Sequence, residues 1–419
     1  MKRKKILAKD RASIRSTSKR TFTSWGFQHY RKYAIGTFVM NLGTWMNRIA
    51  QDWLIIQLTG SGVALGIVTG IQFAPAIFLS FYGGSLGDRH NKKAIMAVCS
   101  AMISLSGVIL AVIVLANLQT VTIVYIFALV VGIFSSIDMP IRHSLMSDLV
   151  GEENVSNAVS LNSVNFNLAR IIGPASAGFT VSIFGVAAAL IASSVGYLLF
   201  SIVILNARNT TLRENNEDEN EGHINFLQTL KFIWLDKSIV KVLFMVATLA
   251  FFGLNFQITT ALMAVNIFGL GAAGYGLLSS TTAVGALFGG LISAHRNASI
   301  HESRLARTGL MFGFAQIAAG FSPNIAFYSI MLVFSGFFAL MTTIAANSLI
   351  QQNTPYAIRG KILGIYTVIF SGSMAFGAPA VGYFTDFFGP QETLILGGVA
   401  VVVVSVVVIL STLKQRKAS

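Results

Sequence analysis

The chain has 419 residues, of which 54% are hydrophobic and only 11% charged, and its mean hydropathy is +0.69. A soluble protein has about 25% charged residues, so this composition excludes a soluble domain and indicates an integral membrane protein. The net charge of +14 does not indicate nucleic-acid binding, because the basic residues stand in short clusters between apolar segments. The single cysteine, Cys99, excludes an internal disulfide and a cysteine-based metal site.

The N-terminal segment is strongly basic. Residues 1–32 hold eleven Lys or Arg and one acid, and they lack the apolar core of a signal peptide. We interpret this segment as a tail on the cytoplasmic side, which could also contact anionic lipid headgroups.

Long apolar runs follow from residue 33 onward. A helix needs roughly 20 apolar residues to cross the hydrocarbon core of a bilayer, and runs of this length exclude a β-barrel, whose strands alternate. We therefore predict an all-α integral membrane protein with twelve transmembrane helices. They cover 33–58, 62–86, 94–116, 120–146, 155–184, 187–206, 238–267, 273–294, 304–322, 325–351, 358–385 and 391–412.

The loops between these spans differ in charge. Odd-numbered loops such as 59–62 and 117–120 carry no Lys or Arg, whereas even-numbered loops contain basic residues such as Arg89, Arg208 and Arg359. By the positive-inside rule, both termini and the even-numbered loops face the cytoplasm. The predicted location is the cell membrane.

The chain divides into two similar halves. Residues 207–237 form the longest loop, with an acidic run followed by an amphipathic helix, and we interpret it as a cytoplasmic linker, with an interaction site as the alternative. The segment 173–185 resembles 377–389, 204 positions later. We predict two pseudo-symmetric six-helix bundles with the substrate site between them. Their bounds are 33–206 and 238–412, and a cytoplasmic tail, 413–419, ends the chain.

One loop and three longer segments carry a family resemblance. The loop 83–93, "GGSLGDRHNKK", resembles the signature of the major facilitator superfamily: a Gly-rich helix end, then Asp-Arg, then basic residues. The segments 43–66, 138–150 and 157–178 resemble the drug-antiporter-like branch that includes enterobactin and macrolide exporters. The resemblance covers nearly the whole chain and implies a transporter that works by alternating access. We expect it to act as a monomer.

The resemblance also implies a cytoplasmic gate. Asp88 ends the second span, where it would pair with Arg142 on the fourth span and with the start of the eleventh, holding the cytoplasmic side shut. The matching loop of the second half has Ala294 and His295 instead of Asp-Arg, so this latch is one-sided. The predicted gate residues are Asp88, Arg89, Asp138 and Arg142.

The fifth span carries Gly173, Pro174 and Gly178, which resemble the antiporter motif of the family. Proline bends a helix, and small residues let helices approach closely. Ala169 and Ala177 depart from the family pattern, so simple helix packing is the alternative to a role in antiport.

Charged residues also lie inside the predicted spans, where a charge costs at least ~2.5–3.5 kcal/mol. In the first span Arg48 and Asp52 lie on one helix face, about 22 and 28 Å from the cytoplasmic side, and Arg170 of the fifth span lies about 20 Å in. Asp52 is the candidate proton carrier; alternatively it reaches the outer headgroups and only neutralises Arg48. The predicted proton-coupling or substrate site comprises Asn41, Trp45, Arg48, Asp52 and Arg170.

The function that these patterns favour is proton-coupled export of hydrophobic or amphiphilic small molecules, of drug or siderophore type. A facilitator or importer of a solute or lipid is the alternative, and a non-transporting sensor or scaffold is less favoured because it would leave the intramembrane charges without use. No enzymatic activity, catalytic residue, cofactor, metal or nucleic-acid partner is expected; the expected partners are the small-molecule substrate, protons and membrane lipids.

Overall fold

The computed structural model describes residues 23–206, 226–295 and 301–418. Most of the predicted basic tail and the acidic run of the linker therefore lie outside the described residues. All regular secondary structure in the described residues is helical.

The N-terminal half, residues 23–206, begins with a short 3-10 helix and continues in long helices. Each predicted span of this half coincides with a helix to within a few residues. The elements are η1 (Thr23–Gly26), α2 (Gln28–Thr59), α3 (Gly62–Arg89), α4 (Lys92–Leu115), α5 (Val121–Val150), η2 (Glu152–Asn154), α6 (Val155–Phe184) and α7 (Val186–Leu205).

The C-terminal half, residues 226–418, begins with the short helix α8 at the position of the predicted amphipathic segment. The elements are α8 (Phe226–Leu235), α9 (Lys237–Thr248), η3 (Leu249–Gly253), α10 (Phe256–Leu262), η4 (Met263–Ile267), α11 (Ala272–His295), α12 (Glu302–Gly320), α13 (Ile325–Asn353), α14 (Tyr356–Phe388) and α15 (Pro390–Ala418).

One predicted span, 238–267, is not a continuous α-helix. Two π-helical turns, η3 and η4, interrupt it on either side of α10. At the first interruption the side-chain amide of Asn255 donates to the backbone oxygens of Ala250 and Phe251, at 3.1 and 2.8 Å. The side chain thus binds carbonyl groups at the point where the regular helical pattern is lost.

Nine helical segments of the described chain are long and apolar enough to cross a membrane. Three helices at predicted spans are not among these nine, namely α2, α6 and α12. The first two contain the intramembrane arginines, Arg48 and Arg170, and the third carries charged residues in its first turns. The structure is thus that of an all-α membrane protein, and polar side chains distinguish the three exceptions.

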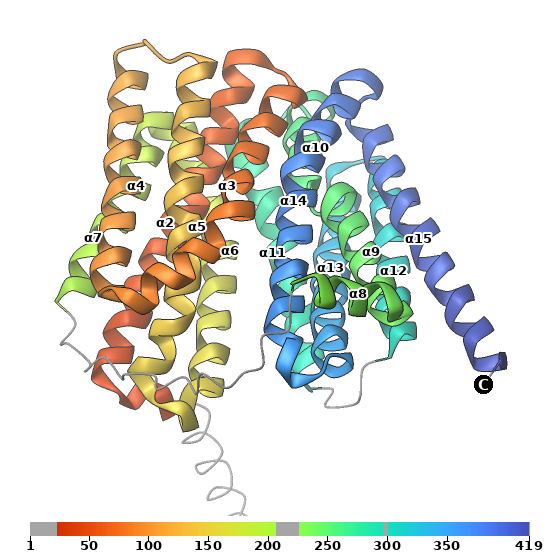
Figure 1. Ribbon diagram of the computed structural model, residues 1–419. Helices are drawn as coiled ribbons and strands as arrows, with labels where there is room; N and C mark the ends of the chain where they lie inside the picture. Colours follow the sequence, from red (N-terminus) through yellow and green to blue (C-terminus); the bar gives the residue numbers. More distant parts are fainter. Residues whose placement is uncertain (1–22, 207–225, 296–300, 419) are drawn as a thin grey trace, which may run out of the picture.

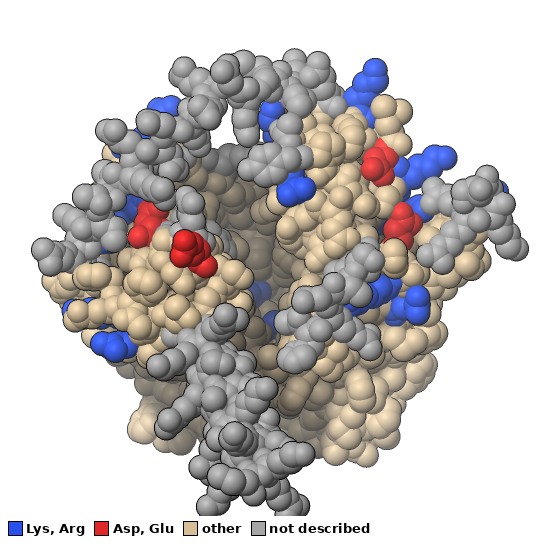
Figure 2. All heavy atoms as spheres, turned by 90° about the horizontal axis from the view of Figure 1, so that it is seen from below, with Lys and Arg blue, Asp and Glu red and all other residues tan. Residues whose placement is uncertain are grey.

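Helices α2 to α7 lie on one side of the molecule and α8 to α15 on the other (Figure 1). Helix α2 begins, and α15 ends, on the same side, which we call the terminal side; the opposite side is the far side. The two halves meet where α3 packs on α14 and α6 packs on α11. Seen from the terminal side, the surface between the halves is hollowed (Figure 2).

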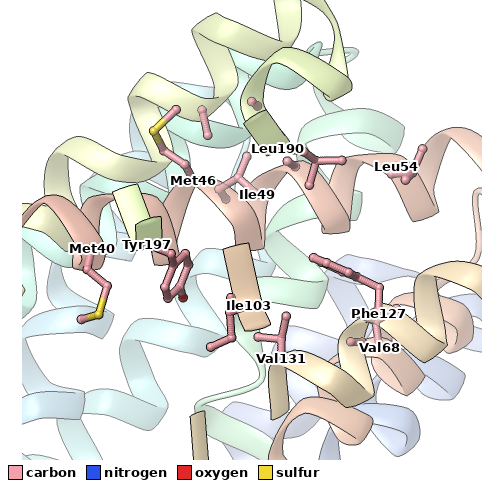
Figure 3. Close-up of a cluster of buried hydrophobic side chains, with 14 of the residues drawn as sticks. Met40, Met46, Ile49, Leu54, Val68, Ile103, Phe127, Val131, Leu190 and Tyr197 are labelled. Carbon is pink, nitrogen blue, oxygen red and sulfur yellow. The ribbon is translucent and has the colours of Figure 1, made fainter. Parts of the chain in front are cut away.

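Apolar side chains fill the interior of the N-terminal half around α2 (Figure 3). Burying each such side chain from water contributes roughly 1.5–3 kcal/mol, and within a bilayer close packing takes over this role. These contacts hold one face of α2 against the other helices of the N-terminal half. The core residues include Met40, Met46, Ile49 and Leu54 of α2, Ile103 of α4, Phe127 and Val131 of α5, and Leu190 and Tyr197 of α7.

A polar cluster joins three helices of the C-terminal half on the terminal side. The carboxylate of Glu302, at the start of α12, accepts from Nζ of Lys241 at 2.9 Å and from Oγ1 of Thr412 at 2.8 Å. Burial raises the pKa of Glu302, but hydrogen bonds from Ser238, Lys241 and Thr412 outweigh this effect and leave the pKa below its ordinary value. The charged form therefore helps to hold α9, α12 and α15 together.

Candidate functional site between the two halves

Two arginines from different helices converge on one indole ring. The guanidinium carbon of Arg48 on α2 lies 6.0 Å from the ring centroid of Trp45, and that of Arg170 on α6 lies 5.4 Å from it. Arg48 also lies 5.4 Å from the ring of Phe73 on α3. Aromatic faces attract cations, most strongly where water is excluded, so the rings hold both side chains. The structure thus brings together three of the predicted site residues.

Asp52 lies one turn beyond Arg48 and is enclosed by protein, with 4% of its surface exposed. Its carboxylate accepts a hydrogen bond of 2.7 Å from the hydroxyl of Tyr275 on α11. Among the described residues no Lys or Arg nitrogen lies within 4.0 Å of this carboxylate. Because α2 and α11 belong to different halves, the hydrogen bond between Asp52 and Tyr275 joins the N-terminal half directly to the C-terminal half.

A small cavity lies between the halves, lined by Trp45, two turns before Asp52 on α2, and by Ser279, one turn after Tyr275 on α11. Its volume is about 10 Å³, which is room for one water molecule. The indole nitrogen of Trp45 and the hydroxyl of Thr282 are buried at its wall and have no hydrogen-bond partner among the described residues. The lining residues are Trp45, Arg170 and Pro174 from the N-terminal half and Phe256, Gln257, Thr260, Ser279 and Thr282 from the C-terminal half.

Asn41 does not join this group, although it shares a helix face with Asp52 in the sequence. It lies nearer the terminal side, where Nη1 of Arg142 is 3.5 Å from its side-chain oxygen. Arg142 also pairs with Asp138, four residues earlier on α5, and its guanidinium carbon lies 5.9 Å from the ring of Phe200. Asp138 and Arg142 thus interact within the N-terminal half. Arg89 is exposed at the end of α3, and the side chain of Asp88 lies outside the described residues.

On the far side, a second polar contact joins the halves. Asp386 at the end of α14 accepts three hydrogen bonds from the start of α3: from Oγ of Ser61 at 2.6 Å, from the backbone N–H of Gly62 at 2.5 Å and from that of Val63 at 3.0 Å. A helix N-terminus carries unpaired N–H groups and a partial positive charge, so it favours a carboxylate. The carboxylate of one half thus caps a helix of the other.

Glycines allow close backbone approach in the same region. A Cβ on Gly66 of α3 would collide with the backbone of Ala378 on α14, and one on Gly276 of α11 would collide with the backbone oxygen of Pro174 on α6. Both seams between the halves are therefore closed by nearly direct backbone contact on the far side.

The predicted motif on α6 makes one close contact within the N-terminal half and one between the halves. A Cβ on Gly173 would lie 2.5 Å from Cβ of Trp45, so this glycine makes room for the indole. A Cβ on Gly178 would lie 2.5 Å from the backbone oxygen of Ala272 on α11. Gly173, Pro174 and Gly178 are all buried. Their positions show close packing of α6 against both halves.

Two residues of this region, Tyr275 and Asp386, are absent from the predicted site. Tyr275 stands in an apolar helix, where a tyrosine usually serves packing. Asp386 lies at the end of a span, and its partners are mostly backbone groups, which have no signature in the sequence. Among the described residues, no group of three His, Cys, Asp or Glu side chains could hold a metal ion.

The helical fold, the two halves and the polar residues enclosed between them define a membrane transporter of the major facilitator type. The chain belongs to the transmembrane secretion effector family of this superfamily, whose pattern it matches over residues 20–419. The resemblance seen in the sequence is thereby confirmed, and the protein is a transporter rather than an enzyme.

Characterised relatives match over most of their length. The chain is 22% identical to the staphyloferrin A transporter of Staphylococcus aureus over 375 residues, 88% of this chain and 93% of that protein. It is 22% identical to the enterobactin exporter EntS of Citrobacter koseri, over 89% of this chain and 84% of the relative. It is 21% identical to macrolide efflux protein A of Streptococcus pyogenes, over 92% and 96%.

A solved structure shares the fold. The chain superimposes with a TM-score of 0.71 on a bacterial homologue of the human lysosomal transporter Spinster, crystallised in an inward-facing and unoccupied conformation. The match covers 91% of this chain and 95% of that chain, at 15% identity. The arrangement of helices is therefore one that membrane transporters adopt.

Proposed function

We propose that this protein exports hydrophobic or amphiphilic small molecules from the cell by alternating access, driven by protons. The observation that carries the proposal is the hydrogen bond between Asp52 and Tyr275, because it places a buried, protonatable carboxylate at the contact between two halves that must separate during transport. The relatives named for siderophores and for macrolide efflux support the substrate class, and the two named as an exporter and an efflux protein support the direction.

The proposed topology has twelve spans in two six-helix bundles, 33–206 and 238–412, with both termini in the cytoplasm and the linker 207–237 between the bundles. The basic tails support this orientation, because positively charged segments stay on the cytoplasmic side. The terminal side is then cytoplasmic. Since the far side is sealed and the terminal side is hollowed, the conformation is inward-facing. The protein is proposed to work as a monomer in the cell membrane.

Asp52 is the proposed proton carrier. While the far side is closed, its carboxylate is bound by Tyr275 and shielded from the outside. Opening of the far side would break this bond and expose the carboxylate to the external solution, where it can take up a proton. Closure would then carry the proton to the inward-facing state, and a motion that exposes Asp52 to the hollow on the terminal side would release it to the cytoplasm. Uptake of a proton from outside would thus accompany each return to the inward-facing state.

The predicted gate residues on α3 and α5 are proposed to act in the outward-facing state. When the cytoplasmic side closes, the signature loop of α3 would approach α14, with Asp88 and Arg89 contributing to the latch. Asp138 and Arg142, already paired on α5, would support it from the N-terminal half. Gly173, Pro174 and Gly178 would let α6 slide against α11.

Transport by purified protein in proteoliposomes tests this proposal. Macrolides and siderophores serve as substrates, with an imposed pH gradient and with the gradient collapsed by a protonophore. We expect gradient-dependent transport by the wild type and loss of this dependence in Asp52→Asn. The matched control is Asp148→Asn, which removes an exposed carboxylate paired with Lys92 at 2.8 Å within the N-terminal half.

Each outcome is informative. Transport that persists without a pH gradient would contradict proton coupling and favour a facilitator. Full coupling in Asp52→Asn would exclude Asp52 as the carrier. If no compound moves in either direction, the protein is not an exporter of this class.

A further inference from the structure

Several hydrogen-bond donors of the residues that line the cavity between the halves have no partner among the described residues. Arg170 has five N–H donors in a planar fork, yet among the described residues its guanidinium makes no hydrogen bond or ion pair, and its guanidinium carbon lies 5.4 Å from the ring centroid of Trp45. Arg170 is half-buried, and no side chain around it occupies these donors, so they are available to a ligand or to water.

Two further residues that line the cavity have a buried polar atom without a partner among the described residues. The indole N–H of Trp45 can only donate, and it is buried without a partner at the wall of the cavity that Arg170 also lines. The hydroxyl of Thr282, from the opposite half, is buried there without a partner as well, with 2% of the residue exposed. A buried polar atom without a partner costs about as much as a lost hydrogen bond, so such atoms tend to mark a ligand or water.

The charged side chains around the cavity also favour an anion. Arg48 lies against the same indole ring as Arg170, while the nearby acid, Asp52, is bound by Tyr275. The residues that line the cavity include no acid. Seen from the terminal side, basic side chains are visible deep in the hollow, whereas the acidic ones visible in that view lie on the surrounding surface (Figure 2).

We propose that the transported molecule carries an acidic oxygen group, such as a carboxylate, and that Arg170 binds this group. Arginine binds such groups through two parallel hydrogen bonds, and Trp45 and Thr282 supply further donors from the two halves. The proposal rests on the proposed transport function and names its substrate class: amphiphilic organic acids. The cavity has room for one water-sized group in this conformation, so it takes one oxygen of the acidic group, and the other oxygen and the rest of the molecule lie outside it.

Binding from both halves gives the acidic group a role in the transport cycle. Trp45 and Arg170 belong to the N-terminal half and Thr282 to the C-terminal half. An anion between them would relieve the repulsion between Arg48 and Arg170 and connect the halves across the cavity. A neutral or cationic molecule of the same shape gains neither effect, so charge distinguishes substrates from other amphiphiles.

Matched sets of aromatic amphiphiles test the inference. Each set shares one skeleton, such as 4-(1-naphthyl)butyl, and presents it as the carboxylate, the amide and the amine. Affinity for the purified full-length protein is measured by microscale thermophoresis, and transport of the same compounds is measured in proteoliposomes. The variants are Arg170→Gln and Arg170→Lys. The control is Arg307→Gln on α12, whose guanidinium bonds Ser303 of its own helix.

We expect each carboxylate to bind at least about tenfold more tightly than its amide and amine, the scale of one charge-assisted pair. Arg170→Gln should remove this preference without weakening the amide, Arg170→Lys should retain part of it, and Arg307→Gln should not change it. Retained binding of the amide shows that the glutamine variant is folded.

The inference is overturned if the amine or the amide binds as tightly as the carboxylate, if no carboxylate binds, or if Arg170→Gln keeps the preference. The two proposals fail separately. Carboxylate-selective binding without transport would contradict the transport function and leave the anion site standing. Transport of the amines and amides alone would leave the transport function standing and exclude the anion site.

Discussion

The hydrogen bonds of Asp386 make a quantitative prediction about the closed far side. Asp386→Ala removes three acceptor contacts at the start of α3. A helix-capping side chain contributes about 0.5–2 kcal/mol, and a carboxylate at a helix N-terminus adds about 0.3–1 kcal/mol. Because Asp386 is exposed, the lower parts of these ranges apply. The expected loss is about 1–2 kcal/mol, which raises the ratio of open to closed far side roughly 5–30-fold.

Distances between spin labels on the far side measure this ratio. Labels at Leu118→Cys and Pro323→Cys lie in the α4–α5 and α12–α13 turns, one in each half, and both native residues are exposed. The background is Cys99→Ala, which removes the single native cysteine. We expect pulsed electron paramagnetic resonance to show a larger population at long distance in Asp386→Ala. An unchanged distribution would refute the assignment of this contact as a seal.

A matched series separates the seal from general loss of charge. Ser61→Ala removes one of the three donors and should give a smaller shift in the same direction. Asp148→Asn removes an exposed ion pair with Lys92 that does not bridge the halves, and it should give no shift. An equal shift in Asp148→Asn would mean that the change in net charge, and not the contact, moves the equilibrium.

Three further variants give separate predictions. Tyr275→Phe leaves the buried carboxylate of Asp52 without its donor and should lower the free energy of unfolding by about 1–3 kcal/mol. The unfolding temperature should fall in this variant and recover when Asp52→Asn is added; an unchanged temperature in Tyr275→Phe contradicts the prediction. Gly66→Val forces a side chain into the backbone of Ala378 and should cost about 1–3 kcal/mol of the closed far side, visible as longer distances between the same labels. For Glu302→Gln the lowered pKa sets the pH range: the charged form stabilises the fold above about pH 4.3, and this contribution disappears as the pH falls through the lowered pKa. Wild type and variant should therefore differ in unfolding temperature at pH 7 and converge once the pH is below the lowered pKa of Glu302; a difference that persists in strong acid would rule out this cause.

The composition and the apolar runs were sufficient for the fold class, because length and hydropathy alone decide whether a helix can cross a membrane. Charges indicated the candidate site for a related reason, because an arginine such as Arg170 is costly in an apolar helix. The spacing of Trp45 and Arg48 correctly placed them on one face of α2. Local periodicity gives this information directly.

The same periodicity grouped Asn41 with Asp52, and the structure separates them. The two residues are eleven positions apart, which is about 16 Å along a helix, so one face of α2 passes different neighbours at different depths. Asn41 meets Arg142 of α5, whereas Asp52 meets Tyr275 of α11. A helical stripe predicts direction but does not identify the helix that it faces.

Contacts between the halves were beyond sequence reasoning for a different reason. Asp386 binds backbone N–H groups 323 and 324 residues earlier in the chain, and backbone groups are the same whatever the residue. The interruptions at η3 and η4 were also missed, because the apolar run 238–267 has the composition of a straight span. Asn255 was the one available signal, since an amide in such a run needs local partners.

The bond between Asp52 and Tyr275 also has a consequence for biosynthesis. The two residues are separated by 223 positions, so at roughly 5–20 residues per second the ribosome supplies the tyrosine about 10–45 s after the aspartate. Throughout that interval the nascent first half contains a carboxylate whose donor does not yet exist. Until α11 emerges and docks, that carboxyl group needs water, a proton or its neighbour Arg48 in place of the tyrosine.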